Sequence, residues 1–416
     1  MLKIFLAEDE VIVRETIKRM IPWEDLGFEL VGEAADGEMA LPLLLRQKPD
    51  LLITDIKMPF MDGLSLSRIV REELPRTKII IISGYDDFEY AREPLLRRMP
   101  NGDLVCVCLS GGKTEPSNQN LVIISRSKDD GCTWSAPEII FQHSERAVWA
   151  TELFCHDNTV CLFLMTYYAP SRYRELILYR SFSTDNGETW SEPQSLPNGI
   201  ISGSVRQGIV LSNGSWVFPI YWQECCGAWD WKLHSVPNDG IDENWPFRCG
   251  VLRTEDNGKS FHIEGYLKAQ TPLWENNIAE YENGKLVMLM RAEFTGYLYR
   301  SFSDDYGKTW SKPEKTDIPN PASKITLLKS GNNILLIHNP TMCQEFCDWN
   351  KRKPLEMWVS SDGTRTWNKK IPLTKVDEPF FYPHGFVDSQ KNLIYIACEN
   401  SQEHFLLKIP INEIEG

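Results

Sequence analysis

The octad Ser183-Thr-Asp185-Asn-Gly187-Glu-Thr189-Trp190 decides the fold of this chain, because its pattern occurs five times. Each copy has a hydroxyl residue, an aspartate two places later, and a second hydroxyl followed by an aromatic residue. The last copy departs from the others, since it has threonine where they have glycine. A repeat at intervals of roughly 50 to 70 residues, with several short strands in each unit, predicts the blades of a β-propeller. The other octads span 127–134, 254–261, 303–310 and 360–367.

We assign the octads to folding rather than to chemistry. Their aspartate and hydroxyl side chains are expected to bond the backbone of their own turn. The aromatic residue is expected to pack between neighbouring sheets. Each octad is therefore placed in the outer turn of a blade, between its third and fourth strands.

Six hairpin corners, each followed by an apolar strand, predict six blades. Corners such as Asn213-Gly214 permit positive φ and favour tight hairpins. Because a propeller brings one strand start per blade to a central axis, residues far apart in sequence can converge on one pocket there. The corners lie at 101–102, 157–158, 213–214, 283–284, 331–332 and 391–392, and the strands at 104–109, 160–165, 216–221, 285–290, 334–338 and 393–397.

The composition argues against a surface that binds nucleic acid. The 416 residues include 44 Lys and Arg against 58 Asp and Glu, a net charge of −14. No run of 18 apolar residues and no signal-peptide pattern is present, so we expect a cytoplasmic protein without a membrane segment. The 11 cysteines are expected to be free thiols, and Cys225-Cys226 and Cys343 with Cys347 lack zinc-ligand partners. We therefore expect no metal and no cofactor in the propeller.

The first 91 residues follow a different rhythm, in which strands alternate with helices. Continuous apolar strands of this kind predict a parallel sheet covered on both faces. Glu8, Asp9 and Asp55 follow two of these strands, and the ends of parallel strands meet at one edge of a sheet. Carboxylates gathered there could hold Mg²⁺. The expected strands span 3–7, 30–34, 51–54 and 78–82, and the expected helices span 11–20 and 37–46, with a third after 63.

This segment resembles the receiver domain of two-component response regulators over its first four strands. The resemblance implies a flavodoxin-like α/β fold with the sheet order 2-1-3-4, and a histidine kinase as partner. It also implies roles for four residues: Glu8 and Asp9 as the acidic metal pair, Asp55 as the phosphoacceptor, and Ser83 as the switch.

The chain departs from a complete receiver after the fourth strand. The next helix would begin near Tyr85, but Glu93-Pro94 interrupts it. The fifth strand, with the lysine that would neutralise the phosphoryl group, is missing, which puts phosphorylation of Asp55 in doubt. We therefore expect a multidomain chain with a truncated receiver domain at 1–91 and an all-β six-bladed propeller at 92–416.

Residues near several blade starts form a second pattern. The octads and these residues make the segment 92–416 resemble the sialidases, which are six-bladed propellers with Asp-box repeats. The resemblance implies three arginines that bind a sugar carboxylate, a tyrosine nucleophile and a glutamate as its base. Glu93 stands where the family has isoleucine in an Arg-Ile-Pro motif. The implied residues are Arg92, Arg291 and Arg352 for the carboxylate, Tyr382 for the nucleophile and Glu275 for the base.

The chemistry explains why these residue types belong together. A sialic acid has a carboxylate on its anomeric carbon, and planar guanidinium groups suit such an anion. An anionic nucleophile would be repelled by that carboxylate, whereas a phenol is neutral until a base takes its proton. The arrangement predicts a retaining, metal-independent exo-glycosidase.

The acid/base position differs from the family, and other residues could face the pocket. Counting back from the first octad places Glu115 where sialidases have an aspartate. Glu152, Arg206 and His384 are further pocket candidates, with salt bridging between blades as the alternative for Glu152 and Arg206. The tryptophan-rich segment 222–246 could stack on sugar rings or pack in the core.

Three functions remain open from the sequence. We favour a sialidase-like enzyme that removes sialic acid or a related acidic sugar; the longer Glu115 leaves other acidic sugars and a uronic acid lyase open. The second is a non-catalytic propeller that binds carbohydrate. The third is a phosphorelay protein in which Asp55 controls the propeller as an output domain.

Overall fold

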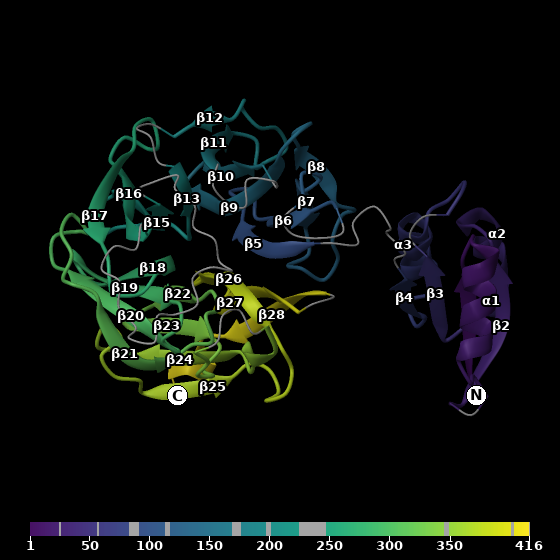
Figure 1. Cartoon of the computed structure of the whole chain (residues 1–416). Coiled ribbons are helices and arrows are strands. Elements are labelled where there is room, and N and C mark those ends of the chain that lie inside the picture. Colours follow the sequence, from purple (N-terminus) through teal and green to yellow (C-terminus); the bar gives the residue numbers. More distant parts are fainter. Residues whose placement is uncertain are drawn as a thin grey trace. The chain divides into compact units, whose positions relative to one another are not determined.

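The computed structural model describes residues 1–24, 26–55, 58–82, 91–112, 117–168, 176–196, 201–223, 247–344, 349–400 and 403–415. The chain divides into two compact units, Met1–Asp87 and Phe88–Gly416 (Figure 1). The described helices are all too short or too polar to cross a bilayer.

The first unit is an α/β layer structure with a parallel sheet in the order β2-β1-β3-β4, as predicted. Alternate residues of β1 point to opposite faces of the sheet. Phe5 packs with Leu44 of α2 and Leu66 of α3 on one face, and Ile4 packs with Ile17 of α1 on the other. Asp36 and Asp62 cap α2 and α3 by accepting backbone N–H bonds. The elements are β1 (Leu2–Ala7), α1 (Val11–Met20), β2 (Phe28–Ala34), α2 (Gly37–Gln47), β3 (Leu51–Asp55), α3 (Gly63–Glu73) and β4 (Lys78–Ile82).

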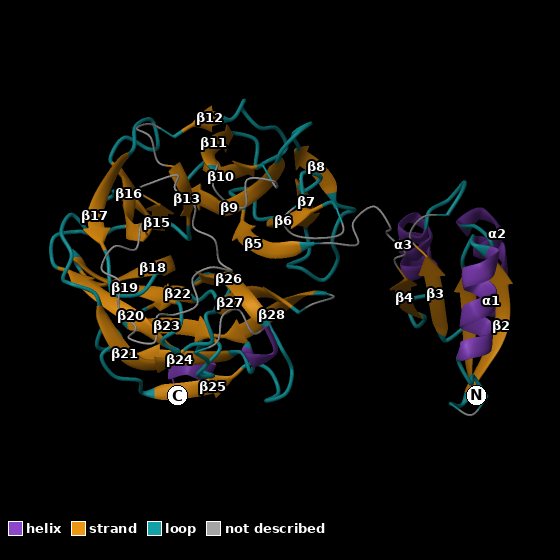
Figure 2. Cartoon of the chain, viewed as in Figure 1, coloured by secondary structure: helices purple, strands orange, loops and turns teal. Residues whose placement is uncertain are grey.

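The second unit is a ring of six antiparallel sheets, the predicted six-bladed propeller (Figures 1 and 2). All six hairpin corners lie between the first two long strands of a blade, where the sequence predicted them. The blades are, in order, β5 (Arg92–Arg98), β6 (Leu104–Ser110), β7 (Leu121–Ser127) and β8 (Glu138–Phe141); β9 (Ala147–His156), β10 (Thr159–Tyr167), β11 (Ile177–Ser183) and β12 (Gln194–Ser195); β13 (Ile201–Val205), β14 (Ile209–Val210), β15 (Trp216–Gln223), β16 (Phe247–Thr254) and β17 (His262–Leu267); β18 (Leu273–Glu282), β19 (Lys285–Ala292), β20 (Tyr297–Ser303) and β21 (Glu314–Pro319); β22 (Thr326–Ser330), β23 (Asn333–His338), η3 (Trp349–Lys351), β24 (Glu356–Ser360) and β25 (Lys369–Pro372); and β26 (Phe381–Asp388), β27 (Leu393–Glu399), β28 (His404–Pro410) and α4 (Asn412–Glu415).

The five octads join the third and fourth strands of their blades, and their side chains bond their own turns as predicted. In the second octad, Ser183 Oγ accepts from the Gly187 N–H at 2.7 Å. Asp185 accepts from the Thr189 N–H at 2.9 Å and from its hydroxyl at 2.6 Å. Trp190 meets Phe141 of the preceding blade edge to face, so the octad also ties neighbouring sheets together.

Among the described residues the sixth sheet has three strands, β26, β27 and β28, and none of them comes from the N-terminal side of the propeller. Three arginines of β5 link blade 1 to blade 6 at this junction, which we call the seam. Arg92 pairs with Glu399 at 2.9 Å, and Arg98 pairs with Asp388 at 2.7 Å. Arg97 donates to the Gly385 carbonyl at 3.1 Å.

Candidate functional site

The same backbone irregularity begins the inner strands of blades 1, 4 and 6. Two residues bulge out of the ladder after Arg92, after Trp274 and after Phe381. The first bulged residue is Glu93, Glu275 or Tyr382, and each has a positive φ of 43° to 54°. Such strain in non-glycine residues is costly and clusters at functional sites. The three bulges place one acid, a second acid and a phenol at equivalent positions around the ring.

Glu275 is the centre of a buried ion-pair chain. One of its carboxylate oxygens lies 3.0 Å from Arg206 of blade 3, and the other lies 2.6 Å from Arg291. Arg291 also contacts Glu293 at 2.7 Å, and Arg206 reaches Glu93 at 3.2 Å. Burial acts to raise the pKa of Glu275, but Arg291 and Arg206 outweigh it and lower this pKa to about 2.

Tyr382 lies beside this chain, together with Arg352. The Arg352 guanidinium is fully buried and is centred 5.2 Å from the Tyr382 ring. Burial and the nearby Glu275 carboxylate raise the pKa of the Tyr382 phenol, against the opposing effect of Arg352 and Arg291. The structure therefore brings together Glu275, Arg291, Arg352 and Tyr382, from blades 4, 5 and 6.

Arg92 lies at the rim of this group. Its Nε pairs with Glu399, whose other oxygen accepts from the Glu93 backbone N–H at 2.7 Å. The guanidinium groups of Arg92 and Arg352 lie 5.5 and 5.8 Å from the centre of the same ring, Phe381. The Phe381 ring therefore separates Arg92 from Arg352, the first and third of the arginines predicted to bind the carboxylate.

Glu152 and His384 form a buried polar layer with Arg97, across blades 1, 2 and 6. Glu152 lies 2.7 Å from Arg97 and 3.1 Å from His384 Nε2. His384 Nδ1 accepts from the Leu96 N–H, so Nε2 has the proton and donates it to Glu152. Burial and the adjacent Arg97 lower the pKa of His384 to about 3. For Glu152 the bridging alternative therefore fits, whereas Arg206 bridges blades and also contacts Glu275.

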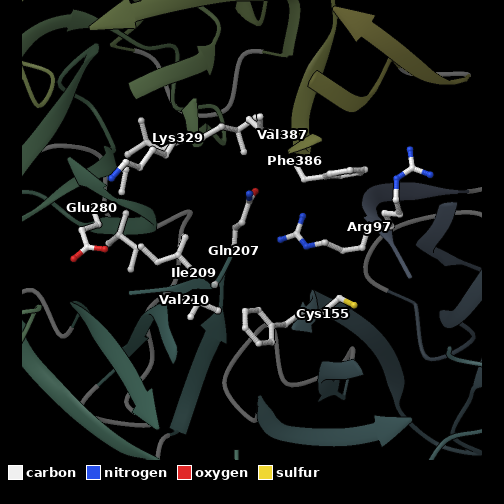
Figure 3. A pocket seen from close by; sticks show the side chains of 16 residues that line it. Arg97, Cys155, Gln207, Ile209, Val210, Glu280, Lys329, Phe386 and Val387 are labelled. Atoms are coloured by element: carbon white, nitrogen blue, oxygen red, sulfur yellow. The ribbon is translucent and has the colours of Figure 1, made fainter. Parts of the chain in front are cut away.

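A pocket of about 350 Å³ lies on the axis beyond this layer (Figure 3). Its lining comes from all six blades, mostly from the later part of each inner strand, whereas Glu93, Glu275 and Tyr382 lie near the starts. The pocket and the Tyr382 group therefore lie toward opposite ends of the axis. Labelled residues of its lining are Arg97, Cys155, Gln207, Ile209, Val210, Glu280, Lys329, Phe386 and Val387.

The acidic cluster of the first unit has the predicted composition. Carboxylate oxygens of Glu8, Asp9 and Asp55 lie within 4.8 Å of one another. Burial raises the pKa of Glu8, and the Asp55 and Asp9 carboxylates add to this effect, as expected where acids share a site. Oxygen donors at such spacing suit Mg²⁺. Ser83, the predicted switch residue, lies outside the described residues.

Two further predictions fall outside the described residues: the acid/base candidate Glu115, and most of the tryptophan-rich segment at 222–246. Trp222 itself is described; it is buried and meets Tyr266 edge to face, which fits core packing.

The sequence reasoning missed Glu93, Glu293 and Lys324 as residues of the site. Lys324 lies beside the Tyr382 ring, at 5.8 Å from its centre. Of these three residues, only Glu93 could have been predicted from the sequence. It is a charged residue at a position expected to be apolar, and a buried charge needs a partner.

A family model for the BNR repeat-like domain matches residues 102–396. The chain belongs to this family. Solved structures similar to this BNR repeat-like protein include the Hadza microbial sialidase Hz136, with a TM-score of 0.63 and 18% identity over 82% of this chain and 71% of that one. The Trypanosoma rangeli sialidase in complex with the inhibitor DANA has a TM-score of 0.56 and 17% identity over 77% and 55%. The K499G mutant of the NanB sialidase from Streptococcus pneumoniae has a TM-score of 0.59 and 12% identity over 78% and 69%. At these identities the likeness shows the fold, a sialidase-like propeller.

The first unit is a response regulator receiver domain, and a model of that family matches residues 4–99. The uncharacterized transcriptional regulatory protein YesN of Bacillus subtilis is 42% identical over 95 residues, 23% of this chain and 26% of YesN. The transcriptional regulatory protein HptR of Staphylococcus aureus is 42% identical over 92 residues, 22% of this chain and 36% of HptR. The chain thus spans about a quarter to a third of the relatives it matches.

Proposed function

We propose that the propeller is a sialidase-like exo-glycosidase, which hydrolyses a terminal sialic acid or related acidic sugar with retention of configuration. The observation that carries the proposal is the buried group of Tyr382, Glu275, Arg291 and Arg352. Its members come from three blades yet meet at one end of the axis. The resemblance of the propeller to sialidase structures supports it further.

The arginines act first, by binding the sugar carboxylate. Arg291 and Arg352 both act electrostatically on the Tyr382 phenol, and the guanidinium groups of Arg92 and Arg352 lie near the same Phe381 ring. A carboxylate that binds Arg291 competes with Glu275 for the same guanidinium. Binding therefore weakens the pair that holds the pKa of Glu275 low, and Glu275 becomes a better base.

Tyr382 then attacks the anomeric carbon while its phenol proton moves to Glu275. The bond to the leaving oxygen breaks, and Glu115 is assigned to protonate that oxygen. In the second step Glu115 takes a proton from water, the water oxygen attacks the anomeric carbon, and the tyrosyl bond breaks. Glu275 returns its proton to the departing phenolate, so the enzyme is restored.

Release of a fluorophore from sialosides, uronides and neutral glycosides tests this function. We expect turnover of an acidic glycoside, with loss of about 10² to 10⁴-fold in kcat for Tyr382→Phe and for Glu275→Gln, because each removes a group that moves in the reaction. Tyr266→Phe is the matched control, since Tyr266 is 66% exposed on β17. Unchanged glycan binding with no turnover in any variant or in the wild type would instead support a non-catalytic carbohydrate-binding propeller.

The receiver domain supports a second function, phosphotransfer from a histidine kinase. The supporting observation is the cluster of Glu8, Asp9 and Asp55, which fits a Mg²⁺ ion beside the proposed phosphoacceptor Asp55. Mg²⁺ supplies charge neutralisation at such a site when it is bound, and Glu8 and Asp9 are the residues proposed to hold it.

Acid-labile phosphate on the intact chain tests this second function. With acetyl phosphate and Mg²⁺ we expect labelling of the wild type and of the control Asp377→Asn, which changes an exposed propeller residue. Asp55→Asn should remain unlabelled. Equal labelling of Asp55→Asn, or none of the wild type, would remove the phosphoacceptor role of Asp55.

A further inference from the structure

Lys324 is a buried cation that the mechanism above does not use. It lies two residues before β22, near the start of the inner strand of blade 5, and only 4% of it is exposed. Its Nζ lies 5.8 Å from the centre of the Tyr382 ring. Within the part of the chain that the structure describes, Nζ has no hydrogen-bond partner. Since a buried ammonium without an acceptor is costly, this donor points to an acceptor that arrives with a ligand.

Two nearby arginines, Arg206 and Arg291, differ from Lys324 in that their charges already face carboxylates. Arg206 lies between Glu93 and Glu275, and Arg291 lies between Glu275 and Glu293. Burial lowers the pKa of Lys324 and Arg206 adds to this effect, whereas the Glu93, Glu275 and Glu152 carboxylates act to raise the pKa. Those carboxylates therefore favour the charged ammonium although they do not bond it.

Several charged side chains surround Tyr382 among the described residues, and Lys324 is one of them. The cations are Arg206, Arg291, Arg352 and Lys324, and the carboxylates are Glu93, Glu275 and Glu293.

We propose that the Lys324 ammonium binds the carboxylate of the sugar and makes the site selective for acidic over neutral ligands. The inference rests on the proposed function, because it concerns the same site and the same class of ligand. It assigns to Lys324 a binding role that is separate from the proton transfer between Tyr382 and Glu275.

Calorimetric binding of two probes tests the proposal: the unsaturated sialic acid inhibitor DANA, and its methyl ester, which lacks the charge. The variants are Lys324→Met and the matched control Lys329→Met, which changes an exposed lysine of β22, the strand that begins two residues after Lys324. We expect Lys324→Met to weaken binding of the free acid about 10- to 100-fold, as for loss of one charge-assisted hydrogen bond. The ester should bind both variants as it binds the wild type.

The thermal midpoint of Lys324→Met gives an independent reading, because loss of a buried ammonium without a partner should leave the propeller as stable as the wild type or more so. A variant with wild-type midpoint and an unchanged preference for acid over ester overturns the inference and leaves the proposed function intact. If Lys324→Met is strongly destabilised, the ammonium has a structural partner and the inference is wrong. A wild type that binds neither probe and cleaves no acidic glycoside overturns the proposed function, and the inference with it.

Discussion

At the scale of single residues, the candidate site depends on how one carboxylate is held. Glu275 lies at a strained bulge, and its two oxygens face Arg206 and Arg291. These two arginines keep its pKa at about 2 although the side chain is buried. A carboxylate with such a low pKa stays ionised over the pH range in which most enzymes work. It becomes a better proton acceptor only when one of the two arginines binds another anion.

Removal of Arg206 should change the pH dependence of turnover. In Arg206→Met, burial is opposed by one arginine fewer, so the pKa of Glu275 rises by about 1 to 3 units. The acid limb of kcat/KM should then move to higher pH, because Glu275 becomes protonated earlier and loses its role as base. Arg206→Lys retains the charge and should keep the wild-type limb. Identical profiles for all three proteins would show that Arg206 does not act on Glu275.

At the scale of elements, the octads give the propeller a defined response to acid. In the second octad, hydrogen bonds from Thr189 and Ser183 lower the pKa of Asp185 from 3.8 to about 2. Because the folded-state pKa is depressed, this bonding stabilises the fold above pH 3.8 and its effect is lost as the pH falls toward 2.

Asp185→Asn should therefore lower the melting temperature by a few degrees at pH 7, and the difference from wild type should shrink as the pH approaches 3. Asp304→Asn changes an exposed aspartate of the fourth octad that shows no such bonding, and it should behave like wild type at every pH. Melting curves by circular dichroism between pH 3 and 7 measure the effect. A pH-independent difference for Asp185→Asn would contradict it.

The seam between blades 6 and 1 is a second element-scale feature, since arginine pairs link the two blades there. Arg98 binds Asp388 at 2.7 Å and Asp130 at 2.9 Å, and its guanidinium is centred 5.1 Å from the Tyr395 ring. Arg98→Met should cost about 1 to 3 kcal/mol of unfolding free energy, a figure reduced for partial exposure. Lys285→Met breaks an exposed pair with Glu282 and should leave the free energy of unfolding almost unchanged. Equal losses in urea unfolding would argue against a special role for the seam.

The elements themselves were largely predictable from sequence, for a physical reason. The octads and the six polar hairpin corners, three of them Asn-Gly, depend on local backbone geometry, so the sequence located five outer turns and six hairpins. The partners of buried charges were less predictable. Glu93 and Arg206 are 113 positions apart, and only the closed ring makes them neighbours. Lys324 carried no local signal at all, because the residues that act on it come from blades 1, 2, 3, 4 and 6.

At the scale of the whole molecule, the chain joins a response regulator receiver domain to a BNR repeat-like propeller. In the propeller, equivalent bulges on separate blades bring Glu93, Glu275 and Tyr382 toward one end of the axis. Arg97, Glu152 and His384 form a buried layer across the inner strands around the same axis. Residues spread over nearly 300 positions thus make one site, which is why its chemistry depends on the ring as a whole.

Covalent trapping of the nucleophile tests directly whether Tyr382 attacks the sugar. A 2,3-difluorosialic acid should form a long-lived glycosyl-enzyme: the fluoride at C2 leaves as the tyrosyl bond forms, and the fluorine at C3 slows the oxocarbenium-like hydrolysis of that bond. Peptide mass spectrometry should then find the adduct on Tyr382, with none in Tyr382→Phe. An adduct on another residue, or inactivation of neither protein although both bind the sugar, would contradict the account of Tyr382 as nucleophile.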